Sequence, residues 1–224
     1  MIGSLMYLTN MRPDICFSMN TLSQFLTDSR HVHLIATKHI LRYLKGTVDY
    51  GLKYDANQKI NLEGYVDSDW AGSAIDRNST SWCRFIMGSG VISWFSMKQS
   101  CVALSTVEAE YVAACSASCE AIWLRKLLSD IFDLQLDATC DNQSCVKLSE
   151  NPVFHDKSKH IEIKYHYIRD MVQRGAVKLL YVATEEQIAD VLTSRSDVRA
   201  VPFCSWLKDL VPSMSDVSAD HSIE

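Results

Sequence analysis

The chain has 224 residues, of which 47% are hydrophobic and 22% are charged, a composition that excludes an intrinsically disordered protein and fits a globular one. Its formal net charge of -5 argues against nucleic-acid binding through an overall positive charge, because nucleic-acid-binding domains usually carry an excess of Lys and Arg. No apolar segment approaches the roughly 20 residues of a membrane-spanning helix, so the sequence predicts no contact with a membrane.

The cysteines and the first residues of the chain indicate an intracellular protein. The eight cysteines are spread along the sequence and form none of the compact patterns of small secreted domains. The start, MIGSLMYLTNMRPDICF, has no basic segment before its apolar residues and does not match a secretory signal peptide. We therefore expect a protein of the cytoplasm or the nucleus.

The first 46 residues or so have the periodicity of helices. Pro13 stands where a helix can begin, and the segment HVHLIATKHILRYLKG predicts a second helix that ends at Gly46. Apolar residues of the first helix recur at helical spacing, at Ile15, Met19, Leu22 and Phe25 or Leu26. We expect these helices to form no core of their own and to be the end of a larger domain.

Strand-like segments begin at residue 50. Runs of aromatic and β-branched residues bounded by turn residues predict strands at 50–54, 61–70, 82–88 and 90–96. A long helix is predicted from residue 105 to about residue 132, because alanines and larger apolar residues recur there at helical spacing.

The last part of the chain alternates helices and strands. After a short strand within 134–144, the pattern predicts helices at 143–150, 161–174 and 185–192 and a strand at 177–182. Hairpin-like strands followed by this alternation indicate an α/β protein with a mixed sheet flanked by helices. The polar, acidic residues from 212 onward predict a disordered tail.

Acidic residues stand at four places where a strand ends or a helix carries them towards a sheet. These places hold Asp67 and Asp69, which share one face of a strand, then Glu108 and Glu110, then Asp141, and then Asp190. Each alone has an ordinary explanation, as a helix cap or a solvated side chain. If they converge, their mutual repulsion calls for a cation, and carboxylate oxygens suit Mg²⁺ or Mn²⁺.

The long helix begins with two glutamates that helical geometry separates. Residues two apart on a helix lie about 200° apart around its axis, so Glu108 and Glu110 cannot share a face. Glu110 shares its face with Ala113, Ala114, Ala117 and Ala121, a stripe that suits close packing on a sheet. We expect Glu108 to serve the first turn of the helix and to face the solvent.

Ten motifs follow one another along the chain in this order: GSLMYLTNMRPDICFSMNTLSQF, ILRYLKGT, YVDSDWAG, DRNSTS, ISWFSMKQ, ALSTVEAEYVAA, EAIWLRKLL, CDNQS, ENPVFHDKSKHIEIKYHYIRD and EEQIADVLT. On these motifs the sequence resembles the C-terminal part of the Pol polyprotein of copia-type retrotransposons, which is the end of reverse transcriptase followed by a ribonuclease H domain. The resemblance covers residues 1 to about 195.

The resemblance implies a site, a reaction and a division of the chain. It implies that Asp67, Glu110, Asp141 and Asp190 are the catalytic acids and bind two Mg²⁺ or Mn²⁺ ions. The implied reaction is hydrolysis of the RNA strand of an RNA–DNA hybrid, with the polymerase domain supplied by a longer element. It divides the chain into a helical remnant of reverse transcriptase (1–49), a ribonuclease H-like domain (50–195) and a C-terminal helix with a disordered acidic tail (196–224).

Histidines and basic residues near the end of the chain have weaker patterns. The spacing of His155, His160 and His166 does not match a standard zinc site, so we do not predict a zinc site there. The basic residues of the same motif either contact backbone phosphate or form a solvated face, namely Lys157, Lys159, Lys164 and Arg169.

Four cysteines and two of the tryptophans are expected to pack in the core. Core packing is the interpretation for Cys115, Cys119, Cys140 and Cys145. Four tryptophans are candidates for stacking on bases, with core packing expected for the last two: Trp70, Trp82, Trp94 and Trp123.

Three departures from the family pattern bear on activity. Trp82 stands where the family has Gly, Ser194 and Arg195 replace Lys-Pro or Lys-Ala, and the segment before Asp141 is shorter. A shift of one residue in that strand would turn Asp141 to the other face of the sheet. All four acids are nevertheless present, so our hypothesis is a ribonuclease H-like domain with weak or no activity.

Two alternatives remain open besides the enzyme. One is a non-catalytic remnant that binds nucleic acid, and the other is a fragment that acts as a secreted RxLR-type effector. The absence of a signal peptide and of an Arg-x-Leu-Arg motif near the start argues against the effector.

Overall fold

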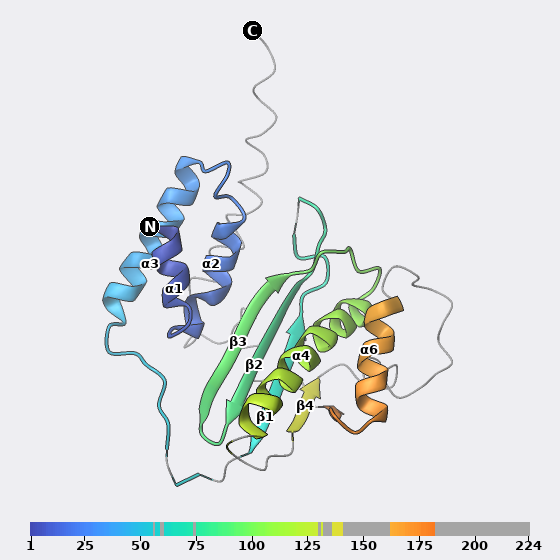
Figure 1. Cartoon of the computed structure of the whole chain (residues 1–224). Coiled ribbons are helices and arrows are strands. Elements are labelled where there is room, and N and C mark those ends of the chain that lie inside the picture. The colour runs from blue at the N-terminus through green and yellow to red at the C-terminus, as the bar shows by residue number, and fades with distance from the viewer. Residues whose placement is uncertain are drawn as a thin grey trace. The chain divides into compact units, whose positions relative to one another are not determined.

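The computed structural model describes residues 1–55, 57–58, 61–73, 75–129, 131, 136–140 and 162–181, with backbone alone for 136–140, 162–166 and 181. Its contacts divide the chain into two compact units (Figure 1). Met1–Leu52 fall in the first unit, and the sheet with its two helices falls in the second. The helices predicted at 143–150 and 185–192 and the acidic tail lie outside the described residues.

The first unit is helical, as its periodicity predicts. It contains α1 (Ile2–Leu8), the short 3-10 helix η1 (Pro13–Ile15), α2 (Cys16–Ser23) and α3 (His31–Gly46). Pro13 occupies the first position of η1, where its missing N–H costs nothing. At the start of α3, the Arg30 N–H donates to His33 Nδ1 over 2.9 Å and so gains a partner that the helix cannot provide.

The helical unit has a small core, which corrects the expectation that it has none. Six buried apolar residues from its helices pack together: Leu5, Ile15, Met19, Leu22, Ala36 and Ile40. Sequence periodicity shows the apolar stripe of each helix, but the angles at which helices meet decide whether the stripes close on one another.

A charged cluster links the residues at η1 with the end of α3. Arg12 Nη2 lies 2.6 Å from Asp14 Oδ2, and Arg12 Nη1 donates to the Thr47 carbonyl over 3.0 Å. The Tyr43 hydroxyl donates to the same Asp14 oxygen over 2.8 Å. Burial, followed by this hydrogen bond, raises the pKa of Tyr43 to about 12.

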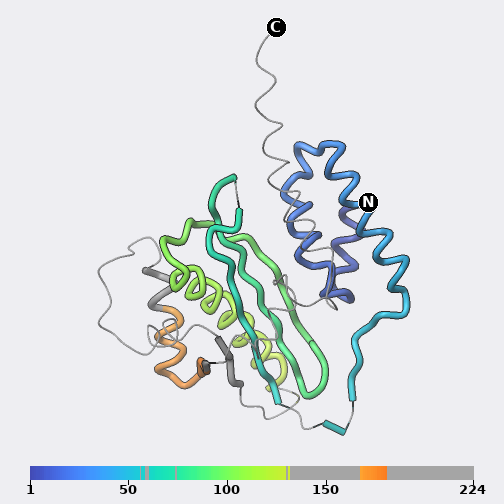
Figure 2. Tube along the Cα trace, turned by 180° about the vertical axis from the view of Figure 1, so that it is seen from behind, coloured from blue at the N-terminus to red at the C-terminus, as the bar shows by residue number. Residues whose placement is uncertain are grey.

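The second unit is built on a five-stranded mixed sheet in the order β3-β2-β1-β4-β5. β1 (Leu62–Ser68), β2 (Thr80–Met87) and β3 (Gly90–Lys98) form an antiparallel meander, and β4 (Leu136–Cys140) and β5 (Leu179–Tyr181) continue the sheet in parallel pairing. The three meander strands lie side by side in Figure 1 and, from behind, in Figure 2. The strand predicted at 50–54 is wrong: these residues adopt no regular structure.

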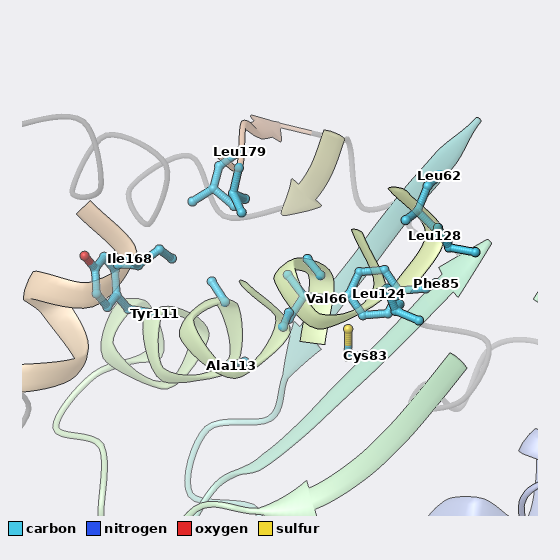
Figure 3. Close-up of a cluster of buried hydrophobic side chains, with 14 residues drawn as sticks. Leu62, Val66, Cys83, Phe85, Tyr111, Ala113, Leu124, Leu128, Ile168 and Leu179 are labelled. Carbon is cyan, nitrogen blue, oxygen red and sulfur yellow. The ribbon is translucent and has the colours of Figure 1, made fainter. Parts of the chain in front are cut away.

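Helix α4 (Thr106–Ser129) packs across β1 and β2 and carries the core of the unit. Its alanines Ala113, Ala114, Ala117 and Ala121 are all buried, which confirms the predicted stripe. They pack with Val66, Cys83 and Phe85 of the sheet (Figure 3). Small side chains allow the helix backbone to approach the sheet closely, so residues of its first turns come near the end of β1.

Helix α6 (Glu162–Gln173) packs against α4 and completes the described unit. Its Ile168 is fully buried beside Tyr111 of α4 (Figure 3). The predicted α/β fold, a mixed sheet flanked by helices, is confirmed. Among the helices of the described residues, none has the length and apolar character to span a membrane.

Candidate functional site

Asp67 and Glu110 meet where strand β1 ends against the start of helix α4. Asp67 is the last residue but one of β1, and Glu110 lies in the second turn of α4. Both carboxylates accept the same backbone N–H, that of Ser68: Asp67 Oδ1 lies 2.7 Å and Glu110 Oε1 lies 3.1 Å from its nitrogen. Two of the four predicted acids are therefore brought together, although 42 residues separate Ser68 from Glu110.

The pair lies in a partly desolvated place. Glu110 is 6% exposed, and Asp67 is partly buried opposite Trp82 of β2. Two carboxylates that share one donor repel each other, and burial weakens the screening of that repulsion by water. A cation at the pair would offset the repulsion.

The donor set of the pair fits a hard divalent cation. Carboxylate oxygens are the ligands that Mg²⁺ and Mn²⁺ prefer. Within the part of the chain that the structure describes, no group of three or more His, Cys, Asp or Glu side chains gathers into a complete site. Asp141 and Asp190 lie outside the described residues, so the described site is a pair of carboxylates.

Strand β4 ends next to this pair in the sheet. Its parallel pairing with β1 runs from Leu62 opposite Leu136 to Val66 opposite Cys140. Val66 precedes Asp67 and Cys140 precedes Asp141 in the sequence. The short segment before Asp141 thus still forms a paired strand up to Cys140.

Glu108 corrects one expectation about the start of α4. It is 5% exposed and does not face the solvent. Its Oε2 accepts the Leu104 N–H, and its own N–H donates to Ser105 Oγ over 3.2 Å. The predicted role in the first turn is confirmed as a capping arrangement, because these contacts satisfy N–H groups that a helix start leaves open.

A buried glutamine next to the pair has no counterpart in the sequence prediction. Gln99, which follows β3, is 4% exposed. Its Nε2 lies 3.1 Å from Ser68 Oγ, 2.9 Å from Ser81 Oγ and 2.9 Å from the Ala109 carbonyl, and these three acceptors share the two hydrogens of the amide. A polar residue directly after a strand is a common loop pattern, so only its three-dimensional contacts distinguish it.

The loop after β1 holds an exposed tryptophan in a fixed orientation. Trp70 is 53% exposed, and its Nε1 donates to the Ala103 carbonyl over 3.1 Å. Ala71 takes a left-handed conformation with φ of 53° and donates its N–H to Ser79 Oγ. Gly72 has no space for a side chain, because a Cβ there would lie 2.0 Å from Asp69 Oδ2.

The other tryptophans divide between core and surface. Trp82 is fully buried, so it offers no surface for stacking and the replacement of the family Gly is accommodated inside the fold. Trp94 is partly buried in β3. Trp123 is 56% exposed, so the prediction that it packs in the core is wrong. It lies in an apolar stretch of sequence, but its position on α4 leaves the side chain exposed.

Cysteine and arginine predictions also have mixed outcomes. Cys115 is buried as expected, whereas Cys119 is exposed. Burial and a hydrogen bond with Cys119 raise the pKa of Tyr167 in α6 to about 12. Arg169 is buried, so it lies neither on a solvated face nor where it could contact phosphate.

Several residues singled out in the sequence lie outside the described part of the structure. His155, His160, Lys157, Lys159 and Cys145 lie outside the described residues. For Lys164 and His166 of α6, and for Cys140 of β4, the backbone alone is described.

Comparison with known proteins gives a consistent set of relatives. No family model matches the chain. The retrovirus-related Pol polyproteins from transposon RE1 of Arabidopsis thaliana and from transposon TNT 1-94 of Nicotiana tabacum are 42% and 43% identical to it over 196 and 195 residues. The alignments cover 86% of this chain but 13% and 15% of those relatives, so the chain spans about one seventh of their length.

A shorter relative matches over most of its own length. Secreted RxLR effector protein 161 of Plasmopara viticola is 44% identical over 124 residues, which are 55% of this chain and 87% of that relative.

Solved structures of ribonucleases H are among those that resemble the fold. The N-terminal ribonuclease H domain of Rv2228c from Mycobacterium tuberculosis matches with a TM-score of 0.46 and 12% identity, over 70% of this chain and 99% of that one. LC11-RNase H1, isolated from compost, matches with a TM-score of 0.44 and 16% identity, over 60% of this chain and 93% of that one.

Proposed function

The chain belongs to the family of retrovirus-related Pol polyproteins of copia-type transposons, and from this premise we propose that its sheet unit is a ribonuclease H domain. The domain would hydrolyse the RNA strand of an RNA–DNA hybrid. The observation that carries this proposal is the convergence of Asp67 and Glu110 on one backbone N–H at the end of β1. Neither a helix cap nor a solvated surface explains two buried or partly buried carboxylates that share one donor.

Asp67 and Glu110 would hold the metal, with Asp141 and Asp190 as further ligands by family resemblance. The parallel pairing of Cys140 with Val66 supports Asp141, since Asp67 follows Val66 and Asp141 follows Cys140 in the sequence. Divalent ions bound there would supply Lewis-acid chemistry for an in-line phosphodiester hydrolysis. The residues of this chain would bind and orient the ions and limit the access of water around Glu110.

A direct test is the hydrolysis of a labelled RNA–DNA hybrid by the full chain in Mg²⁺ or Mn²⁺. We expect the wild type to cleave the RNA strand, weakly in view of its departures from the family pattern. Asp67→Asn, Glu110→Gln and Asp141→Asn should each lower the cleavage rate at least about 100-fold, which is the upper end of the effect of outer-shell residues. Acids that bind metal as one unit give losses that do not add.

Glu108→Gln is the matched control for Glu110→Gln. Both glutamates are buried in the same helix, but Glu108 accepts the Leu104 N–H at the helix start, whereas Glu110 accepts the Ser68 N–H. Cleavage should survive Glu108→Gln. A wild-type chain that binds the hybrid in a salt-dependent manner without cutting it would identify the decayed, non-catalytic remnant instead.

The effector relative favours a second candidate function, a secreted effector. The absence of an Arg-x-Leu-Arg sequence argues against the effector. The two candidates also differ in location, because an effector would act outside the cell and the proposed ribonuclease H in the cytoplasm or nucleus. Fractionation decides between the two. Detection of the intact chain outside the cell, with no hybrid cleavage in vitro, supports the effector.

A further inference from the structure

Gln99 contacts the sequence neighbour of each carboxylate in the acid pair. Ser68, whose hydroxyl accepts from Gln99 Nε2, follows Asp67 in β1. Ala109, whose carbonyl accepts from the same nitrogen, precedes Glu110 in α4. The third contact, with Ser81 Oγ, ties the glutamine to β2. One buried amide therefore joins the two elements that carry the acids.

The backbone of Gln99 limits the movement of this amide. Its N–H donates to the Ser79 carbonyl over 2.8 Å, next to the start of β2. The Ala109 carbonyl can only accept, so the NH₂ group of the amide must point towards α4. Gln99 Oε1 is buried and accepts no hydrogen bond within the described residues, a cost that residues selected for stability alone usually avoid.

Ser68 transmits the contact to both carboxylates. Its N–H is the donor that Asp67 Oδ1 and Glu110 Oε1 share, and its Oγ lies within hydrogen-bond distance of Gln99. A small displacement of Ser68 or of the first turns of α4 would change the separation of the two acids. A metal site depends on such outer contacts, which fix the orientation of its ligands.

We propose that Gln99 is a positioning residue that holds Asp67 and Glu110 in register and thereby sets the affinity of the pair for divalent metal. The metal part of this inference rests on the proposed function. The effect of Gln99 on the Ser68 N–H does not, because that hydrogen bond exists in the metal-free chain.

The test compares the full-length wild type with Gln99→Met, which keeps the volume of the side chain and removes its donors. We expect faster hydrogen–deuterium exchange of the Ser68 amide in the metal-free protein, measured by NMR. We also expect the Kd for Mn²⁺, measured by titration calorimetry, to rise about 10- to 100-fold, as for other residues that orient metal ligands.

Ser118→Ala is the control for a loss of stability without a loss of positioning. Its Oγ is buried and donates to the Ala114 carbonyl over 2.8 Å on the same helix, away from the acid pair. This variant should leave the Ser68 exchange rate and the Mn²⁺ affinity unchanged. If Gln99→Met lowers the thermal midpoint but behaves like Ser118→Ala in both measurements, the positioning role is overturned.

A double-mutant cycle tests the route through Ser68. The effects of Gln99→Met and Ser68→Ala on Mn²⁺ affinity should not add, whereas those of Gln99→Met and Ser118→Ala should add. Additive effects in the first pair would contradict the route. Ser68→Ala removes one contact of Gln99, so it takes the place of Gln99→Met if that variant does not fold.

The experiment distinguishes a failure of the proposed function from a failure of the positioning role. If the wild type binds no Mn²⁺, the metal site is refuted. The positioning role of Gln99 is then tested by the exchange rate of the Ser68 amide alone. A faster rate in Gln99→Met then supports positioning of the pair, and an unchanged rate contradicts it.

Discussion

At the scale of single residues, burial alone does not identify a functional carboxylate. Glu108 and Glu110 are both buried in α4, yet they accept hydrogen bonds from different parts of the chain. Glu108 closes the helix on its own preceding loop, whereas Glu110 reaches the end of β1. The difference follows from the turn of the helix between them, which directs the two side chains to different neighbours.

Trp70 offers the first prediction at this scale. Base–aromatic stacking contributes ~1–3 kcal/mol, so Trp70→Ala should weaken hybrid binding at least about fivefold. The measurement is fluorescence anisotropy with a labelled hybrid, in the Glu110→Gln background to prevent cleavage. Trp123→Ala is the matched control, because that indole is equally exposed but lies on α4, 13 residues beyond Glu110. Equal losses in the two variants would contradict a specific role of Trp70.

Tyr43 gives a prediction about pH. Its pKa is raised from 10.0 to about 12, so its neutral form is favoured in the folded chain. The corresponding stability is fully present below pH 10 and is lost as the pH rises through about 12. Chemical unfolding of the wild type should therefore become easier over this window, and unfolding of Tyr43→Phe should change less. Parallel pH profiles of the two proteins would refute the assignment.

At the scale of elements, the small-residue face of α4 decides how near Glu110 comes to the sheet. Local periodicity predicts that face, and the structure buries it against β1 and β2. By contrast, residues 50–54 resemble a strand in composition but adopt no regular structure. A strand needs a partner for its backbone N–H and C=O groups, and sequence composition does not show whether a partner is available.

Ala113→Leu tests the approach of α4 to the sheet. Overpacking a buried site costs about 1–3 kcal/mol, so the free energy of unfolding should fall by that amount. Because the helix must move outward, the Kd for Mn²⁺ should rise as well. Lys126→Leu, at an exposed position of the same helix, is the control and should change neither quantity. Unaltered Mn²⁺ binding in Ala113→Leu would show that the contact of Glu110 does not depend on this packing.

At the scale of the whole molecule, the chain contains two units, each with its own buried cluster. The helical cluster was not expected from the sequence, because its apolar residues lie on separate helices whose mutual packing the periodicity does not show. The cluster arises from a few residues on different helices, and only their packing shows that these residues meet.

Met19→Ala tests whether the helical cluster is independent of the sheet. Removing a buried Met usually costs ~2–5 kcal/mol, so amide exchange within residues 1–52 should become faster. Exchange at Ser68 and in α4 should stay at the wild-type rate. Met6→Ala, at an exposed position of α1, is the control. Equally accelerated exchange in both units would show that they unfold together.

The sequence predicted the described helices and all five described strands, and it wrongly predicted one further strand at 50–54. Helical and strand periodicity depend on neighbours a few residues away, and that information is complete in a single chain. The motifs that run from Gly3 to Thr193 add the family and, by resemblance, its four acids. Predictions failed where burial was inferred from a local apolar run, as at Trp123 and Cys119.

The sequence by itself determined the α/β class, the long alanine-faced helix, and Asp67 and Glu110 as candidate ligands. The tertiary structure decided that these two acids share the Ser68 N–H, that Glu108 is a buried cap, and that Gln99 connects the neighbours of both acids. The physical reason is range: periodicity is local, whereas hydrogen bonds between β1, β2 and α4 depend on how closely the helix packs on the sheet.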